Sequence, residues 1–132
     1  MTQTILIHMI VFNPDYYFRP DEKRVFVINK GHSHQSTHGW DSIVHPIHAI
    51  VFSAFQHYEP WDVVISRLSN FLEKPKESVE AMIKPFVGNP ENVFVEQGGQ
   101  QFKIPKNILI RSEEPISYER IFDIDDFLFK EH

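Results

Sequence analysis

The sequence contains no cysteine among its 132 residues. Disulfide bonds, thiolate zinc sites and iron–sulfur clusters bound by the chain's own thiolates are therefore excluded. Glycine is also scarce, at five residues, and no glycine-rich phosphate-binding loop is present. No serine lies in a nucleophile-elbow pattern. The chain carries no catalytic constellation, so we expect it to bind a partner rather than to transform a substrate.

Long hydrophobic runs and an excess of positive charge are absent as well. No apolar run approaches the roughly 20 residues that span a bilayer, and residues 1–12 lack the charged start and the cleavage site of a signal peptide. The formal net charge is −5, whereas binding to nucleic-acid phosphates requires clustered lysine and arginine. We therefore expect a soluble cytoplasmic protein that binds neither a membrane nor a nucleic acid.

Apolar residues are abundant, at 42% of the chain, which is enough for the core of one domain. Between residues 45 and 89 they recur with the 3.6-residue period of amphipathic helices, interrupted near Pro60 and Pro75. The three apolar stripes are Ile47, Ile50, Val51, Ala54, Phe55 and Tyr58; Trp61, Val64, Ile65, Leu68 and Leu72; and Val79, Met82, Ile83, Phe86 and Val87. Three helices that each have one apolar face must share a core. Pro85 predicts a kink in the third helix.

Segments rich in β-branched and aromatic residues predict strands on both sides of the helices. They are residues 5–12, 16–19, 24–29 and 40–45 before the helices, and 93–104 and 107–110 after them. Residues 16–29 form a hairpin, and residues 93–104 form another that turns at Gly98 and Gly99. For residues 5–12 three interpretations stay open: an N-terminal strand, a mobile arm, or a segment upstream of a natural start at Met9. The predicted class is α+β.

The last 21 residues differ in character from the rest, since they are acidic with scattered aromatic side chains. Their apolar residues, Phe122, Ile124, Phe127, Leu128 and Phe129, predict docking onto this domain or onto a neighbouring one. The carboxylates of Asp123, Asp125 and Asp126 lack the spacing of a calcium-binding loop. We divide the chain into an N-terminal strand or arm (1–12), one domain (13–111) and an extension or linker (112–132).

A histidine cluster in the loop of residues 30–39 raises the question of a metal site. His32, His34 and His38 lie in this loop, and His45 and His48 follow it. Imidazole binds zinc, nickel and copper, but designed sites usually add carboxylate or thiolate ligands and supporting hydrogen bonds, which this loop does not offer. We interpret the cluster as a solvated loop and expect no metal.

The order of the elements is that of a winged helix-turn-helix: N-terminal antiparallel strands, three helices, and a C-terminal hairpin that forms the wing. The segments NPDYYFRPDEKRVFVIN, HPIHAIVFSAF and PWDVVISRLSNFL resemble a PqqD-like domain, the recognition element (RRE) for precursors of ribosomally synthesised, modified peptides (RiPPs). The following NVFVEQGGQQFKIPKNILI resembles the segment after such a domain at the N-terminus of radical SAM/SPASM peptide maturases. The resemblance covers residues 13–110 and rests on pattern and order rather than on a short motif.

This resemblance implies binding of a precursor's leader peptide by β-strand addition, in a groove between the strand before the helices and the third helix. The residues at these positions are Asp41, Ser42, Ile43, Val44 and His45 on the strand, and Val79, Met82, Ile83 and Phe86 on the helix. An open strand edge offers unpaired N–H and C=O groups, and side-chain pockets give selectivity. Lys76 and Lys84 would contact acidic leader residues, unless they are ordinary surface lysines.

Alternatives to this groove remain. Met82 and Phe86 also fit positions in the core. If residues 5–12 pair with the strand edge, the domain is autoinhibited, forms a homodimer by strand exchange, or binds its peptide elsewhere.

The resemblance also implies that the domain is not itself an enzyme. It would present the core peptide to a radical SAM domain in the same chain or in another, and that domain would hold the iron–sulfur cluster and S-adenosylmethionine. Two other functions stay open: a winged-helix transcription regulator and a general protein–protein adaptor. The predicted third helix has no arginine, which makes it a poor match to DNA phosphates.

Overall fold

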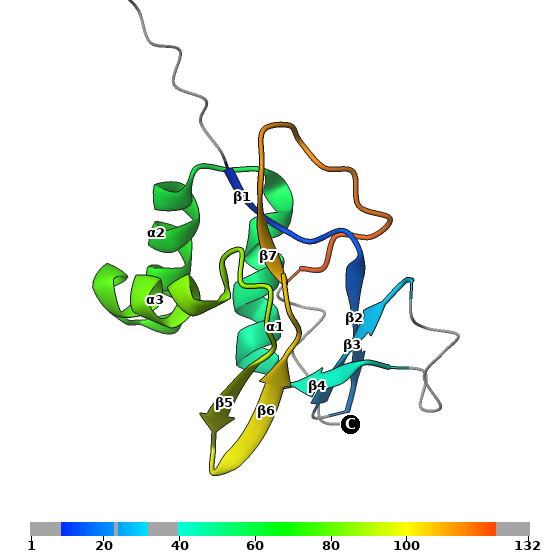
Figure 1. Ribbon diagram of the computed structural model, residues 1–132. Helices are drawn as coiled ribbons and strands as arrows, with labels where there is room; N and C mark the ends of the chain where they lie inside the picture. Colours follow the sequence, from blue (N-terminus) through cyan, green and yellow to red (C-terminus); the bar gives the residue numbers. More distant parts are fainter. Residues whose placement is uncertain (1–8, 23, 32–39, 124–132) are drawn as a thin grey trace, which may run out of the picture.

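A computed structural model describes residues 9–22, 24–31 and 40–123 (Figure 1), and it has the mixed α+β composition that the sequence predicted. The strands are β1 (Met9–Phe12), β2 (Tyr16–Asp21), β3 (Arg24–Asn29), β4 (Ser42–Val44), β5 (Val93–Gln97), β6 (Gln100–Ile104) and β7 (Leu109–Ser112). The helices are α1 (Pro46–Ser53), α2 (Trp61–Leu72) and α3 (Lys76–Ile83), with 3₁₀ helices η1 (Ala54–His57) and η2 (Lys84–Phe86). None of the described helices is long and apolar enough to cross a membrane.

The strands form three small antiparallel sheets, with the orders β2-β3-β4, β5-β6 and β1-β7. Both predicted hairpins are confirmed, and Gly98 and Gly99 at the second turn have φ angles of 61° and 78°. Glycine reaches this left-handed region without strain. The central strand β3 is buried on both faces, as its run of four apolar residues predicted.

The N-terminal strand β1 pairs with β7 and not with β4. Phe12 lies opposite Leu109 in this ladder, and the amide N–H of Asn13 donates to the carbonyl oxygen of Ile108 at 3.0 Å. The side chain of Asn13 adds a hydrogen bond to the carbonyl oxygen of Asn107 at 2.9 Å. The N-terminal strand interpretation is therefore confirmed for residues 9–12, and these residues do not close the edge of β4. Residues 5–8 lie outside the described part of the chain.

Proline residues set the boundaries of the helices. Pro46 is the first residue of α1, and Pro60 and Pro75 immediately precede α2 and α3. The predicted kink at Pro85 takes the form of a helix end, because α-helical geometry stops at Ile83 and the chain continues as η2. A proline at position 85 has no N–H for the carbonyl group four residues earlier, so the α-helical ladder cannot run through it.

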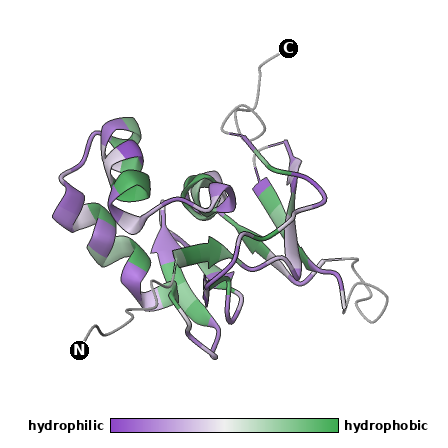
Figure 2. Ribbon diagram, turned by 90° about the horizontal axis from the view of Figure 1, so that it is seen from above, coloured by the Kyte–Doolittle hydropathy of each residue, from purple (hydrophilic) through white to green (hydrophobic). Residues whose placement is uncertain are grey.

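Helix α1 lies at the centre of the molecule (Figures 1 and 2). In the view of Figure 2 it is seen end-on, with α2 and α3 on one side and the strands β2 and β3 on the other. Five of its eight residues are buried: His48, Ala49, Val51, Phe52 and Ser53. A helix that is apolar on most sides must be covered on most sides. The core therefore surrounds α1, and polar side chains on this helix, such as His48 and Ser53, are buried with the apolar ones.

The segment after β7 packs back onto the same domain. The hydroxyl group of Tyr118 donates to the carbonyl oxygen of Phe12 at 2.5 Å. Phe122 is buried beside Phe18, with ring centroids 6.1 Å apart, and its N–H donates to the side-chain oxygen of Gln56 at 2.9 Å. The sequence predicted docking of this segment onto the same domain or onto a neighbouring one, and Phe122 docks onto the same domain. Ile124, Phe127, Leu128, Phe129, Asp125 and Asp126 lie outside the described residues.

Candidate functional site

Strand β4 is an edge strand. Within residues 9–22, 24–31 and 40–123, its three residues pair only with β3, in a register that places Ile43 opposite Phe26 and Ser42 opposite Val27. The N–H of Asp41 donates to the carbonyl oxygen of Val27 at 2.8 Å, which marks Val27 as a residue whose backbone faces β4. The alternation of an antiparallel ladder then turns the N–H and C=O of Ile43 away from β3. These groups are what an added strand would use.

The remaining strand residues of the predicted groove hold β4 in place. The Asp41 carboxylate accepts a hydrogen bond from the N–H of Asn29 at 2.6 Å. Val44 is fully buried in the core. His45 ends the strand and caps α1, since its Nδ1 accepts a hydrogen bond from the N–H of Ile47 at 3.1 Å. Ile43 is thus the strand residue with its backbone available, and the residues around it are anchors.

The hairpin β5–β6 lies beside β4, which the sequence did not predict. The buried hydroxyl group of Ser42 donates to the carbonyl oxygen of Lys103, and the ring of His45 makes an edge-to-face contact with Phe102 at 5.8 Å. In the described part of the chain no backbone ladder joins β4 to β6. The alternating apolar residues of 93–104 predicted the hairpin, but they carry no information on which strand it approaches.

The helix side of the predicted groove is mostly core. Val79 and Ile83 have no exposed surface, and Phe86 retains only 4%. Met82 is half-buried and is packed against the same core. The core alternative therefore holds for Phe86, and of the four helix residues Met82 alone keeps substantial surface. The two lysines of the prediction, Lys76 and Lys84, are exposed.

His48 lies on α1, three residues after His45, and its ring packs against Phe86 of η2. Its ring lies 6.4 Å from that of Phe86 and 6.2 Å from that of Phe52, and only 4% of the residue is exposed. Its Nδ1 is buried without a hydrogen-bond partner. Burial and the nearby His45 lower the pKa of His48 to about 4, and burial also lowers the pKa of His45. Both imidazoles are therefore uncharged at neutral pH.

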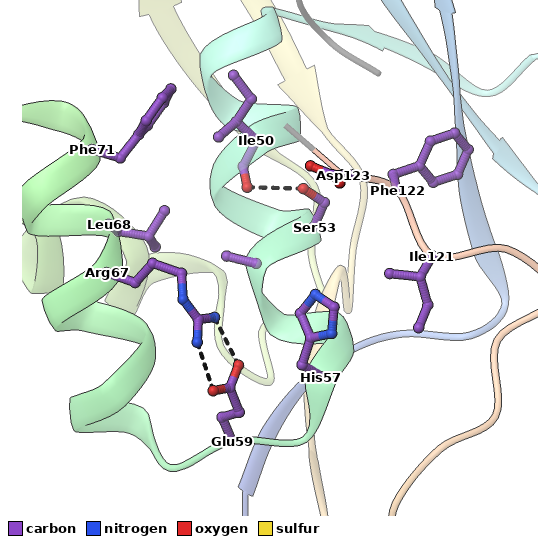
Figure 3. Close-up of a pocket in the computed structure, with 11 residues that line it drawn as sticks. Ile50, Ser53, His57, Glu59, Arg67, Leu68, Phe71, Ile121, Phe122 and Asp123 are labelled. Atoms are coloured by element: carbon purple, nitrogen blue, oxygen red, sulfur yellow. Dashed lines mark hydrogen bonds and ion pairs between the residues drawn. The ribbon is translucent and has the colours of Figure 1, made fainter. Parts of the chain in front are cut away.

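A cavity of about 830 Å³ lies between α1, α2 and residues 121–123 (Figure 3). Ile50, Ala54 and Leu68 line it, and the exposed side chains of Phe71 and Ile121 extend its apolar surface. Sequence reasoning missed this cavity because residues 121–123, which form one wall, lie 50 or more positions after the other lining residues.

Polar groups at this cavity are engaged with one another. Arg67 binds Glu59 through two parallel hydrogen bonds of 2.7 and 2.6 Å. The hydrogen bonds with Arg67 lower the pKa of Glu59, and those with Glu59 raise the pKa of Arg67. The hydroxyl group of Ser53 donates to the carbonyl oxygen of Ile50 at 2.9 Å. This arrangement suits binding of an apolar group and offers no activated nucleophile.

Two further cavities are smaller and more polar, and tyrosine side chains line both: Tyr16 lines each of them, and Tyr118 lines one. One of about 550 Å³ lies between β2 and residues 118–122, and one of about 160 Å³ lies beside Asp41 and Lys106. Burial raises the pKa values of Tyr118 and Tyr16. The Tyr16 hydroxyl group donates to the carbonyl oxygen of Lys106 at 2.7 Å, just as that of Tyr118 donates to a carbonyl group. These hydroxyl groups are structural anchors.

Metal-binding capacity was the remaining question from the sequence. Among the described residues no group of three or more His, Asp or Glu side chains could hold a metal ion. The loop histidines His32, His34 and His38 lie outside those residues.

No protein-family model, no curated protein and no solved structure matches the chain.

Proposed function

We propose that this domain binds an extended peptide by accepting it as an additional strand on β4. The observation that carries the proposal is that, among the described residues, β4 is paired on one side only, with the N–H and C=O of Ile43 turned away from β3. Strand addition supplies affinity through such backbone groups and selectivity through alternate side chains. The absence of an activated nucleophile or metal cluster among the described residues is compatible with binding alone.

The resemblance to PqqD-like domains suggests which peptide this is. The order β4, α1, α2, α3, β5, β6, with β6 beside β4, supports a winged helix-turn-helix in which β5–β6 is the wing. The peptide is then the leader of a ribosomally synthesised precursor. A radical SAM domain, in this chain or in another, modifies the core peptide, and binding of the leader raises the effective concentration of that core.

The surroundings of β4 suggest an apolar leader. Side chains of an added strand point alternately to the two faces of the sheet. One face presents Ile43 beside its cross-strand neighbour Phe26, a buried ring over which the guanidinium groups of Arg19 and Arg24 lie at 4.9 and 5.0 Å. The other face carries the buried Ser42 and Val44, and the hairpin lies on that side, because the Ser42 hydroxyl group donates to the carbonyl oxygen of Lys103. On the Ile43 face, an apolar side chain of the leader would find an apolar neighbour.

The test is a pair of substitutions at one position. Ile43→Pro removes the outward N–H but no hydrogen bond to β3, whereas Ile43→Val keeps the N–H and a similar side chain. Binding of a fluorescent leader peptide, taken from a precursor encoded beside this protein, is measured by polarisation. We expect Ile43→Pro to weaken binding about tenfold, the effect of losing one hydrogen bond of about 1.4 kcal/mol. Ile43→Val should stay within about twofold of the original chain.

A third variant separates the β4 edge from the apolar cavity of Figure 3. Phe71 is 45% exposed at that cavity, so Phe71→Ser changes its surface without opening the core. We expect unchanged leader binding. If Phe71→Ser abolishes binding and Ile43→Pro does not, the peptide binds between α1 and α2 and the proposal is wrong. Circular dichroism and urea unfolding of each variant show whether the fold is intact.

A further inference from the structure

We propose that His45 and His48 form a proton-sensitive latch at the junction of β4 and α1, which opens on acidification and releases the peptide. The effect on the peptide rests on the function proposed above. The opening itself is a property of this chain alone. The two residues lie one helical turn apart, and the N–H of His48 donates to the carbonyl oxygen of His45 at 3.0 Å.

His45 can hold the start of α1 only while its Nδ1 is unprotonated. That nitrogen accepts the hydrogen bond from the N–H of Ile47, 3.1 Å away. A protonated imidazole carries a hydrogen on both nitrogens and accepts no hydrogen bond. Protonation therefore removes the side-chain cap from the first turn and leaves that N–H without its partner.

A positive charge on His48 is unfavourable for a different reason, which is that the ring is buried. The ring is enclosed by Phe52 and Phe86, and its unpartnered Nδ1 has no contact with solvent. An imidazolium ion at this place would lose its hydration without gaining a hydrogen bond. Turning the residue outward to reach water requires the first turns of α1 to separate from Phe86 on η2.

No opposite charge offsets protonation in the described part of the chain. The ring neighbour of His45 is Phe102 on β6, and those of His48 are Phe52 on its own helix and Phe86 on η2. The charged group that acts on His48 is His45, which repels a second proton. With carboxylates absent from both surroundings, the two histidines take up protons more readily in an open junction than in the closed one.

The direction of the pH dependence follows from this difference. Burial lowers the pKa of both groups below the ordinary value of 6.5, and that of His48 to about 4. Well above pH 6.5 both are neutral in either state and the junction stays closed. Between pH 6.5 and about 4 the open junction binds more protons, so acidification favours it. Opening removes support from Val44 at the end of β4, and the peptide site is lost with it.

The latch is tested without peptide by NMR titration of the full chain. We expect the imidazole signal of His48 to titrate well below pH 6.5, with the amide signals of Ile47 and His48 shifting at the same midpoint. His48→Leu, which keeps an apolar ring-sized group, should abolish the larger part of the amide shift. His57→Gln, an exposed histidine of η1, is the matched control and should leave the shift unchanged. A His48 that titrates at pH 6.5 or above overturns the latch, as does a His48→Leu chain with the original amide shift.

The second experiment measures the affinity for the leader peptide at about pH 7.5 and at about pH 5, and compares the two values for each variant separately. We expect roughly tenfold weaker binding of the original chain at the lower pH, within the limit of about thirtyfold that the lowered pKa of His48 sets for the shift towards the open junction between these two pH values. The change should fall below about twofold in His48→Leu. Equal affinity at both pH values overturns release by protons. Absence of binding at both contradicts the proposed function, while the NMR titration still decides the latch. Should His48→Leu not fold, His45→Asn, which keeps a cap acceptor that does not titrate, serves in both arms.

Discussion

Replacing Phe122 by alanine should lower the free energy of unfolding by about 3 kcal/mol, because this side chain anchors the segment after β7. Burial of a phenylalanine contributes about 1.5–3 kcal/mol. Alanine keeps the backbone N–H that donates to the buried side chain of Gln56, so this hydrogen bond of about 1 kcal/mol is lost as well only when the segment lifts away. A core phenylalanine replaced by alanine costs 3–5 kcal/mol, roughly. The lower end applies here, since residues 119–121 are exposed and the segment can lift away instead of enclosing a cavity.

The assay is equilibrium unfolding in urea, followed by the fluorescence of the two tryptophan residues. Ile121→Ala is the matched control, because the adjacent side chain is 47% exposed and its loss should change the unfolding free energy by less than about 0.5 kcal/mol. A loss below about 1 kcal/mol in Phe122→Ala would refute the reasoning. The folded unit would then end at β7, and residues 113–123 would be a linker resting on its surface.

Two other predictions concern hydroxyl and imidazole groups. Tyr118→Phe removes the hydrogen bond to the carbonyl oxygen of Phe12 and should destabilise the chain by about 1 kcal/mol in the same urea assay, and an unchanged midpoint would exclude this anchor. Stability should also fall by about 3 kcal/mol as the pH drops from 6.5 to about 4, because the unfolded chain protonates His48 over this range and the folded chain does not. His48→Leu should flatten that profile measured by urea titrations at each pH, and an equally steep profile would assign the loss to other groups.

Much of the fold could be read from the sequence because its signals are local. The 3.6-residue stripes located α2 and α3, and the prolines before them marked where each begins. The run of four apolar residues in β3 predicted burial on both faces. Gly98 and Gly99 predicted the turn of the second hairpin. These features depend on propensity and on short-range geometry, which are determined by residues close together in the sequence.

The candidate site was harder to predict because it depends on which elements meet. A stripe such as that of α3 shows which side of a helix is apolar, but not whether Phe86 faces the core or a groove. The place of β6 beside β4 is set by contacts such as Ser42 with Lys103, 61 positions apart, and nothing in either segment alone records it. His48 gave a weak signal, since a polar residue on an otherwise apolar helix is a candidate for burial.

The pairing of β1 with β7 also constrains how the chain reaches its folded state. The hydrogen bond between Asn13 and Asn107 joins residues 94 positions apart, so this ladder closes one of the longest loops in the domain. Such distant contacts slow folding, because chain entropy is lost before they form. During synthesis from the N-terminus, the apolar β1 must wait for its partner until β7 has emerged. Until then β1 is an unpaired apolar strand, which is the kind of edge that pairs with the wrong partner.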